Sequence, residues 1–324
     1  MILGLRFRSP ARSLVRVEEI WRRLEACHAI VYFAPEAKPV YTAAGLKGYW
    51  MGYFASRSAA LGAAPADVVT AVFYNFAPAR VERAIPDAWA YSSPDVVLAA
   101  RLEVADQSLR RLLGDLVTAP STAEAAALAQ RAVAACPRAG RPLFAAHAAL
   151  PVPAKPHLAL WWAASALREF RGDGHIAALL AAEVDGCEAN VISVAKGTAA
   201  TTQRESRGWT EAEWAAAAER LRDRGWLAAD GTLTTAGRRA RDDIEAVTDR
   251  LAAPMPAALG PADHDRLVDC LRPIVRRIMD ADAIPFPNAM ALPRLDEPGT
   301  EPVIEAGTEP GTEAGGEPAP TSSD

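Results

Sequence analysis

Six polar side chains in the N-terminal half could together line a pocket for a small molecule. They are His28, Tyr32, Glu36, Arg57, Tyr74 and Asn75. His28 and Tyr32 are four residues apart in a predicted helix, so they share one of its faces. Arg57, Tyr74 and Asn75 lie in runs rich in aromatic residues, and a few polar groups among aromatic ones are typical of ligand sites. The alternative is that these groups satisfy one another and hold the helices together.

A second polar cluster is the run Arg171-Gly-Asp-Gly-His175. We expect the chain to turn here and Asp173 to cap a helix that begins at His175, because a carboxylate accepts hydrogen bonds from the free N–H groups of a first helical turn. Ligand binding or proton transfer by Asp173 and His175 is the alternative. An Asp-x-His pair could also bind a metal ion, but no third ligand is near in the sequence. We therefore predict no metal site.

Familiar catalytic motifs do not occur in the chain, which lacks GxGxxG, GxxxxGKS/T, GxSxG and HExxH. The sequence does not bring together a nucleophile, a base and a group that orients them. We therefore predict no cofactor, and an enzyme is the weaker interpretation. Such an enzyme would use His28, Tyr32, Glu36 and Arg57 in a closed pocket. A protein that only binds a partner is the third interpretation.

The segment 207–251 has the pattern of a helix, a tight turn and a second helix. Thr210 and Glu213 are spaced as a capping box at the start of the first helix. The dipeptide Asp230-Gly231 lies between apolar residues and is a strong signal for a hairpin turn. Helix, hairpin and helix in this order are the pattern of a winged helix, in which the hairpin is the wing.

The charges of this module give DNA binding little support. Glu211 and Glu213 open the helix that would enter a DNA groove, and carboxylates there repel phosphates. The basic residues come later and alternate with acidic ones. The candidates for DNA contact are Arg220, Arg224, Arg238 and Arg239. The alternative is a module that keeps a structural or ligand-binding role.

Helical periodicity predicts a mostly α fold with two degenerate helix-turn-helix units in tandem, the second a winged helix with a small β-hairpin. The tandem prediction depends on a similarity between the segments that begin at Gly52 and Gly174 and on the similar offset of Trp89 and Trp209. Chance similarity of alanine-rich helices is the alternative. The expected parts are an N-terminal helical domain (1–135), a Pro-rich linker (136–157), a winged-helix domain (158–253), a C-terminal helix with a Pro-rich strap (254–294) and a disordered acidic tail (295–324).

Charge and hydropathy narrow the class of protein. The net charge is −5, and residues 296–324 hold eight acidic residues and no Lys or Arg, so residues 1–295 carry −5 + 8 = +3. This near-neutral balance differs from the basic surface of a dedicated nucleic-acid binder. No apolar run reaches the roughly 20 residues of a membrane span, and no secretory signal is recognised. We expect a cytoplasmic protein in which the four distant cysteines are reduced and buried.

Several motifs carry a resemblance to a known family. HAIVYFAPEA, GYFASR, FYNFAP, RGDGH, RGW and DGxLTxxGRxxR together resemble the SalK-like helix-turn-helix proteins of actinobacteria, over about residues 15–293. The hairpin and the helix after it also resemble the MarR group of ligand-responsive repressors, although the acidic helix start and the large N-terminal half differ from that group. The resemblance implies a helix-turn-helix fold in a family whose role is largely unassigned. We predict a regulator-like protein that binds a small molecule between its helices, with DNA and a second copy of the chain as further candidate partners.

Overall fold

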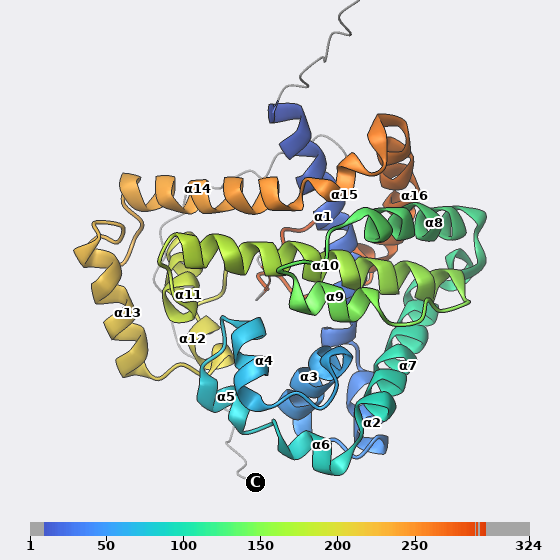
Figure 1. The fold of residues 1–324 in the computed structure, drawn as a ribbon, viewed down its shortest axis with the longest axis horizontal. Helices are drawn as coiled ribbons and strands as arrows, with labels where there is room; N and C mark the ends of the chain where they lie inside the picture. The colour runs from blue at the N-terminus through green and yellow to red at the C-terminus, as the bar shows by residue number, and fades with distance from the viewer. Residues whose placement is uncertain (1–9, 289, 291, 296–324) are drawn as a thin grey trace, which may run out of the picture.

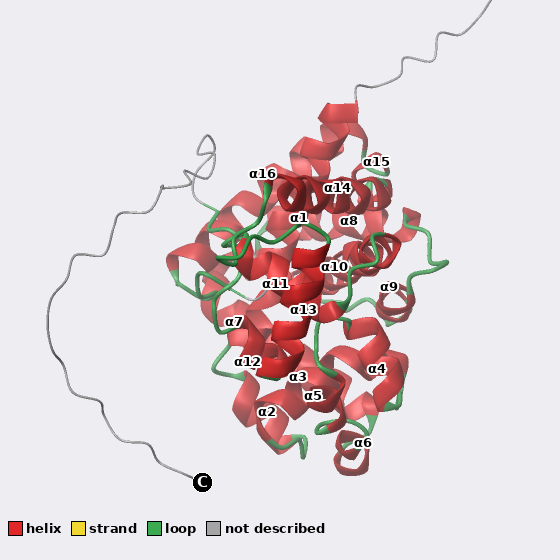
Figure 2. Ribbon diagram, turned by 90° about the vertical axis from the view of Figure 1, so that its left-hand side faces the viewer, coloured by secondary structure: helices red, strands yellow, loops and turns green. Residues whose placement is uncertain are grey.

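Helix α10 (Pro156–Ala181) runs across the middle of the molecule, and helices from both halves of the chain lie around it (Figure 1). The computed structural model describes residues 10–288, 290 and 292–295. Over these residues the fold is mostly helical, as predicted, and Figure 2 shows helices joined by loops. The predicted acidic tail lies outside the described residues from position 296 onward.

The helices before α10 form the N-terminal half and are α1 (Pro10–Phe33), α2 (Ala37–Ala43), α3 (Gly48–Ser58), α4 (Ala66–Phe73), α5 (Pro78–Glu82), α6 (Asp87–Tyr91), α7 (Pro94–Leu113), α8 (Pro120–Ala135) and α9 (Pro142–Ala148). Two short 3-10 helices, η1 (Ala59–Leu61) and η2 (Gly114–Thr118), follow α3 and α7. The helices after α10 are α11 (Gly186–Ala195), α12 (Gln203–Arg207), α13 (Glu211–Asp223), α14 (Thr235–Ala252), α15 (Pro254–Ala257) and α16 (Gly260–Asp280).

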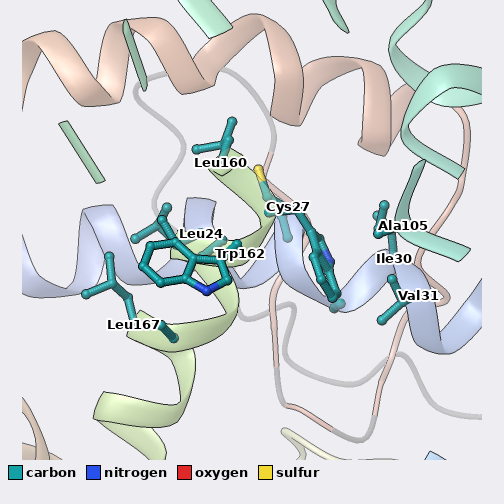
Figure 3. Packing of buried hydrophobic residues seen from close by; sticks show 14 of the residues in the cluster. Leu24, Cys27, Ile30, Val31, Ala105, Leu160, Trp162 and Leu167 are labelled. Carbon is teal, nitrogen blue, oxygen red and sulfur yellow. The ribbon is translucent and has the colours of Figure 1, made fainter. Parts of the chain in front are cut away.

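The larger of two hydrophobic clusters joins α1, α3, α7, α8 and α16 to the first part of α10. Figure 3 shows Leu24 and Cys27 of α1 together with Trp162 and Leu167 of α10 in this packing. The two helices are apolar at these positions because each lies inside the molecule, with neighbours on several sides. This cluster fixes α1, α3 and α10 relative to one another, and these helices carry most of the polar side chains discussed below.

The smaller cluster lies at the end of α10 and includes α11 and α13. Leu179 of α10 and Ile244 of α14 belong to it. The same two helices also reach the larger cluster, through Leu167 of α10 and Ala252 of α14. Helices α10 and α14 therefore connect the two clusters, and α13 lies at the outer edge of the smaller one (Figure 1).

Both helices predicted within 207–251 are present. The capping box at α13 is complete, because the Thr210 side chain accepts from the Glu213 N–H and the Glu213 carboxylate accepts from the Thr210 N–H. Helix α13 ends before Gly225, whose φ of +68° suits glycine. Thr234 caps α14 by accepting from the N–H of Gly237.

The predicted wing between these helices is reduced to a tight reversal. Leu227 and Leu233 form an isolated antiparallel bridge, and the Ala228 N–H donates to the Thr232 carbonyl at 2.8 Å. No β-sheet occurs among the described residues, so the winged β-hairpin is not confirmed. The returning arm is short because Thr234 already serves as the N-cap of α14.

The predicted turn at Arg171–Gly174 is wrong, because helix α10 continues through it without a break. Asp173 is therefore not the N-cap of a helix beginning at His175. Its carboxylate instead accepts from the backbone N–H of Phe144 at 2.9 Å, at the start of α9. Tertiary contacts of this kind outweigh the low helix propensity of two glycines.

The Pro-rich segment 136–157 is not an unstructured connection, because it contains helix α9. Pro142 occupies the first helical turn, where a missing N–H costs nothing. Leu143 and Phe144 are buried in the larger cluster, and the Phe144 ring lies 4.9 Å from that of Phe170. The segment is thus part of the core and lies against α10.

Candidate functional site

A cavity of about 790 Å³ lies between the N-terminal helices and the helices that follow α10. One wall comes from α1, α3 and α10, and the opposite wall comes from α11, α12 and α14. Tyr32 and Arg57 are on the first wall, and Lys196, Arg207 and Ala246 are on the second. We call this space the central cavity. Its size is within the range of small-molecule sites.

Five of the predicted ligand-binding residues line the central cavity, namely Tyr32, Arg57, Tyr74, Asn75 and His175. They come from α1, α3, the end of α4 and α10, so residues far apart in the sequence share one space. Tyr74 and Asn75 also hold α11 in place. The Tyr74 hydroxyl donates to the Val184 carbonyl at 2.6 Å, and the Asn75 carbonyl accepts from Asn190 at 2.8 Å.

The other three predicted residues do not line the cavity. His28 is buried, with Nδ1 at 2.8 Å from Ser165 Oγ and Nε2 at 3.0 Å from the Tyr32 hydroxyl. Glu36 forms an ion pair with Arg111 on α7 at 2.5 Å. Asp173 serves as the acceptor for α9. The enzyme interpretation placed His28 and Glu36 in one pocket with Arg57, and the structure does not bring these three together there.

The end of the cavity near α3 is built around a buried carboxylate, Glu169. Its two oxygens accept from Nε and Nη2 of Arg57, both at 2.9 Å, and Arg168 Nη1 lies 2.7 Å from Oε2. Burial alone would raise the pKa of Glu169, but the charges of Arg168 and Arg57 hold it well below its usual value. One ionised carboxylate therefore faces two guanidinium groups.

Glu25 is the second acid at this end, and it differs from Glu169 in its contacts. It is 2% exposed, and its Oε2 is 3.7 Å from Arg168 Nε with no hydrogen-bond partner among the described residues. Burial raises the pKa of Glu25 above its usual value, which the nearby Arg168 only partly opposes. Glu25 lines the central cavity, although its Oε2 is itself buried.

Two tyrosine hydroxyl groups are surrounded by arginines at the same end. Arg57 donates to the Tyr53 hydroxyl at 3.4 Å, and Arg101 donates to the Tyr32 hydroxyl at 3.2 Å. Burial would raise the pKa of Tyr53, but the positive charges of Arg57, Arg207 and Arg168 together lower it. A lowered pKa despite burial indicates a positive electrostatic potential at the Tyr53 hydroxyl.

The opposite end of the cavity is closed by an ion-pair network between α10 and α14. Arg171 donates to Glu245 at 2.8 Å and to Asp249 at 3.0 Å. His175 Nδ1 lies 2.9 Å from the Thr248 hydroxyl, and burial lowers the His175 pKa to about 4. The ring is therefore neutral at pH 7. At this end the charges of the acidic and basic side chains balance, whereas the end near α3 has more basic than acidic side chains.

Sequence reasoning missed the residues that give the cavity its charge, which are Glu169, Arg168, Arg207 and Tyr53. The sequence pattern singled out nearby runs, the aromatic residues around Arg57 and the polar run 171–175. A signal was available in the helix pattern, since Arg168 and Glu169 interrupt an apolar stretch of the helix. Arg207 offered no such signal, because it ends the short polar helix α12.

Three of the four arginines predicted for DNA contact make contacts within the protein. Arg220 is paired with Asp185 and Glu188, with distances of 2.5 and 2.8 Å. Arg224 donates to the carbonyls of Ala182 and Glu183, directly after α10, and its guanidinium lies over the Trp226 ring. These partners belong to the fold itself, so DNA contact by Arg220 or Arg224 would compete with them.

Arg238 and Arg239 are exposed at the start of α14. One nitrogen of Arg238 donates to the carbonyl of Leu233. Apart from Arg220, which is paired with Asp185 and Glu188, the exposed positions of α13 hold acids and alanines, namely Glu211, Ala212, Glu213, Ala215, Ala216, Glu219 and Asp223. DNA contact by these arginines stays a prediction.

The described residues form neither a metal-binding cluster nor a membrane-spanning helix. The described residues bring no three His, Cys, Asp or Glu side chains together in an arrangement that could hold a metal ion. None of the described helices has both the length and the apolar character of a membrane span. All four cysteines are buried and unpaired, and burial raises the pKa of the Cys27 thiol to about 12.

The comparison with protein families gives a match to the model of a helix-turn-helix family over residues 17–285. No curated protein matches the chain, and no solved structure matches it. The matched residues include the smaller hydrophobic cluster, the larger one except Leu292, and the described residues of the central cavity up to α14. Because the match covers most of the chain, the protein belongs to this helix-turn-helix family.

Proposed function

We propose that the protein is a regulator-like helix-turn-helix protein that binds a small molecule in the central cavity. The order α11, α13, tight turn and α14 resembles that of a winged helix of the MarR type, and the proposal treats α11 to α14 as this module. The motifs quoted above favour the SalK-like group. Membership of a helix-turn-helix family supports the regulator-like role, and the cavity supports the ligand.

The observation that carries the proposal is the position of Arg207. It lines the central cavity, and it precedes Thr210, the N-cap of α13, by three residues. Ser193 and Lys196, at the end of α11, line the same cavity. A molecule bound there would therefore contact the segment that joins the two helices of the module. Binding could shift the position of α13 because a ligand favours the conformation that it contacts best.

The surface of α13 does not favour strong DNA binding. Its exposed acids repel phosphates, and Arg220 is already neutralised by two carboxylates. The proposal therefore assigns any DNA contact to Arg238 and Arg239 at the start of α14, beside the tight turn. Such contact would be of low affinity and sensitive to salt.

The ligand part of the proposal is tested by native mass spectrometry of the protein purified from its own host. We expect a bound molecule on the wild-type chain and its loss in Ala246→Trp, because Ala246 lines the cavity and the indole would fill it. The control is Ala236→Trp, an exposed position on the same helix. Equal occupancy in both variants, with unchanged melting temperatures, would remove the ligand from this cavity. The same spectra report whether the chain forms a homodimer.

The DNA part is tested by gel shift with fragments of the host genome at low salt. We expect Arg239→Glu to weaken any shift, whereas Arg222→Glu on the side of α13 serves as the matched control. An equal loss in both variants would place the contact on α13 instead of α14. A strong shift that survives physiological salt would contradict the electrostatic argument.

A further inference from the structure

A second cavity, of about 540 Å³, lies between the end of α1, α2 and α3. Its lining is mainly apolar and includes Val31, Ala37 and Leu46. We call it the tail cavity. It shares four lining residues with the central cavity, which are Tyr32, Phe33, Tyr49 and Tyr53. The two spaces therefore meet at a group of aromatic side chains.

The junction of the two cavities carries excess positive charge. Arg57, Arg101 and Arg168 are positioned around Tyr32 and Tyr53, directly or through Glu169. The carboxylates among the described residues there are Glu169 and Glu25, which pair with Arg57 and Arg168. Arg101 lines neither cavity but contacts the Tyr32 hydroxyl, so three guanidinium groups surround a junction with two acids even when Arg207 is left aside. Arg101 is 2% exposed and donates to two neutral hydroxyl groups, those of Ser56 and Tyr32.

The junction and the tail cavity differ in chemistry, because the junction is positively charged and the tail cavity is mainly apolar. An anionic group at the junction would gain from the excess charge, and Glu25, when protonated, could donate a hydrogen bond to it. An apolar group in the tail cavity would be removed from water among aliphatic and aromatic side chains. A ligand with only one of these parts would leave the other cavity unused.

We propose that the ligand is an amphipathic anion, with its acidic head beside Arg57, Arg168 and Arg207 and its apolar tail between α1, α2 and α3. This inference rests on the proposed function, since it names the chemical class of the molecule bound in the central cavity. Medium-chain carboxylic acids and arylalkyl carboxylic acids have the required parts. The shared tyrosines Tyr32 and Tyr53 contact both the head and the tail.

The test is a calorimetric titration of the purified full chain with three probes, decanoate, decanol and acetate. We expect decanoate to bind at least roughly tenfold more tightly than either of the others, because only decanoate has both a charge and a tail. Comparable affinities for decanoate and decanol would remove the anionic head from the proposal. Comparable affinities for decanoate and acetate would remove the tail.

A pair of variants locates the tail. Ala37→Phe places a ring in the tail cavity, and Ala43→Phe makes the same change at an exposed position of α2 outside it. We expect decanoate affinity to fall by roughly tenfold or more in the first variant and to stay unchanged in the second. Unchanged affinity in Ala37→Phe, in a variant that melts like the wild type, overturns the tail site.

The outcomes separate this inference from the proposed function. If the native protein carries a molecule that Ala246→Trp displaces and that molecule is neutral or lacks an apolar tail, the central cavity is a ligand site but the amphipathic anion is wrong. If decanoate binds and Ala37→Phe abolishes it while Ala246→Trp has no effect, the tail site stands without the proposed link to the central cavity.

Discussion

Glu169 is the residue on which the charge of the central cavity depends. It is fully buried and holds Arg57 and Arg168 through short contacts. A buried carboxylate placed between two guanidinium groups offsets part of the free-energy cost of removing both cations from water. Without the Glu169 carboxylate, the positive charges of Arg57 and Arg168 would face only the carboxyl of Glu25, whose pKa is raised by burial.

We predict that Glu169→Gln lowers the free energy of unfolding by about 3–5 kcal/mol, because removal of one partner leaves buried charge uncompensated. Urea unfolding at pH 7 measures this. The control is Asp263→Asn, which breaks an exposed ion pair with Arg131 and should cost less than about 1 kcal/mol. Equal losses in the two variants would show that Glu169 has no special role in holding the arginines.

Asp173 gives a prediction about pH. Burial raises its pKa from 3.8 to about 6, which the hydrogen bond from the Phe144 N–H opposes. Between these two values the folded protein keeps a proton that the unfolded chain has released. Stability therefore falls as pH rises through this window, by up to roughly 3 kcal/mol for this group.

We predict that Asp173→Asn removes this contribution, because the amide oxygen can still accept from Phe144 and carries no charge. The difference in unfolding free energy between variant and wild type should increase from pH 4 to pH 6 in favour of the variant. Urea unfolding at several pH values checks it. All other ionisable groups are the same in both proteins, so their contributions cancel in this comparison. A difference that does not change with pH would contradict the assignment.

Residue types indicated part of the site but not its charge. Tyr32, Arg57 and His175 stood out because polar groups in apolar surroundings are visible in a sequence, and the structure places them on one cavity. His28 stood out for the same reason, yet its partners Ser165 and Tyr32 satisfy it. Which polar group is satisfied depends on contacts between distant residues, and a sequence pattern does not contain these.

At the scale of elements, helix ends were more predictable than helix interiors. The capping box at Thr210 depends only on local residues, and it is present as predicted. The continuation of α10 through Arg171–Gly174 depends on Arg171 reaching α14 and Asp173 reaching α9. The tandem-repeat prediction also depends on contacts between distant residues. The Trp89 indole N–H donates to the Ala64 carbonyl within its own half, whereas the Trp209 indole N–H donates to the Asn75 carbonyl in the other half.

Close contact between α11 and the end of α4 gives an element-level prediction. A Cβ added to Gly186 would lie 2.0 Å from the carbonyl oxygen of Tyr74. We predict that Gly186→Ala destabilises the protein by about 1–3 kcal/mol, because backbone would have to move. Thermal melting followed by circular dichroism measures it.

The control for that prediction is Gly172→Ala in α10. There the nearest atom to an added Cβ is the end of the flexible Arg168 side chain, at 3.3 Å. Alanine also favours the helix over glycine, so we expect no loss and a gain of up to about 1 kcal/mol. If Gly186→Ala is as stable as Gly172→Ala, α11 does not pack on α4 as described.

At the scale of the whole molecule, two hydrophobic clusters share the helices α10 and α14, and the central cavity lies between them. The sequence predicted a mostly helical protein with a separate C-terminal module. It did not show that one long helix would serve both clusters, because the two glycines within α10 suggested a break. The cavity arises from this arrangement, in which α14 and the loop before α13 face α1 and α3.

The shared helices lead to a prediction about cooperativity. Since α10 and α14 belong to both clusters, we expect the two clusters of the wild-type chain to unfold together. Pulsed hydrogen exchange at increasing urea, read on peptides from α8 and α13, should give the same midpoint for both. Separate midpoints in the wild type would show that the clusters are independent domains.

The variant that should uncouple them is Arg171→Met, which keeps an apolar contact with Trp21 and removes the hydrogen bonds to Glu245 and Asp249. Each bond to a charged group contributes about 1.5–3 kcal/mol, and here they hold α14 on α10. We expect the α13 peptides to lose protection at lower urea than the α8 peptides. Arg131→Met, which breaks only an exposed ion pair within the larger cluster, should leave the midpoints together. A common midpoint in Arg171→Met would mean that the remaining contacts, apolar packing and the His175–Thr248 hydrogen bond, hold α14 on α10 without Arg171.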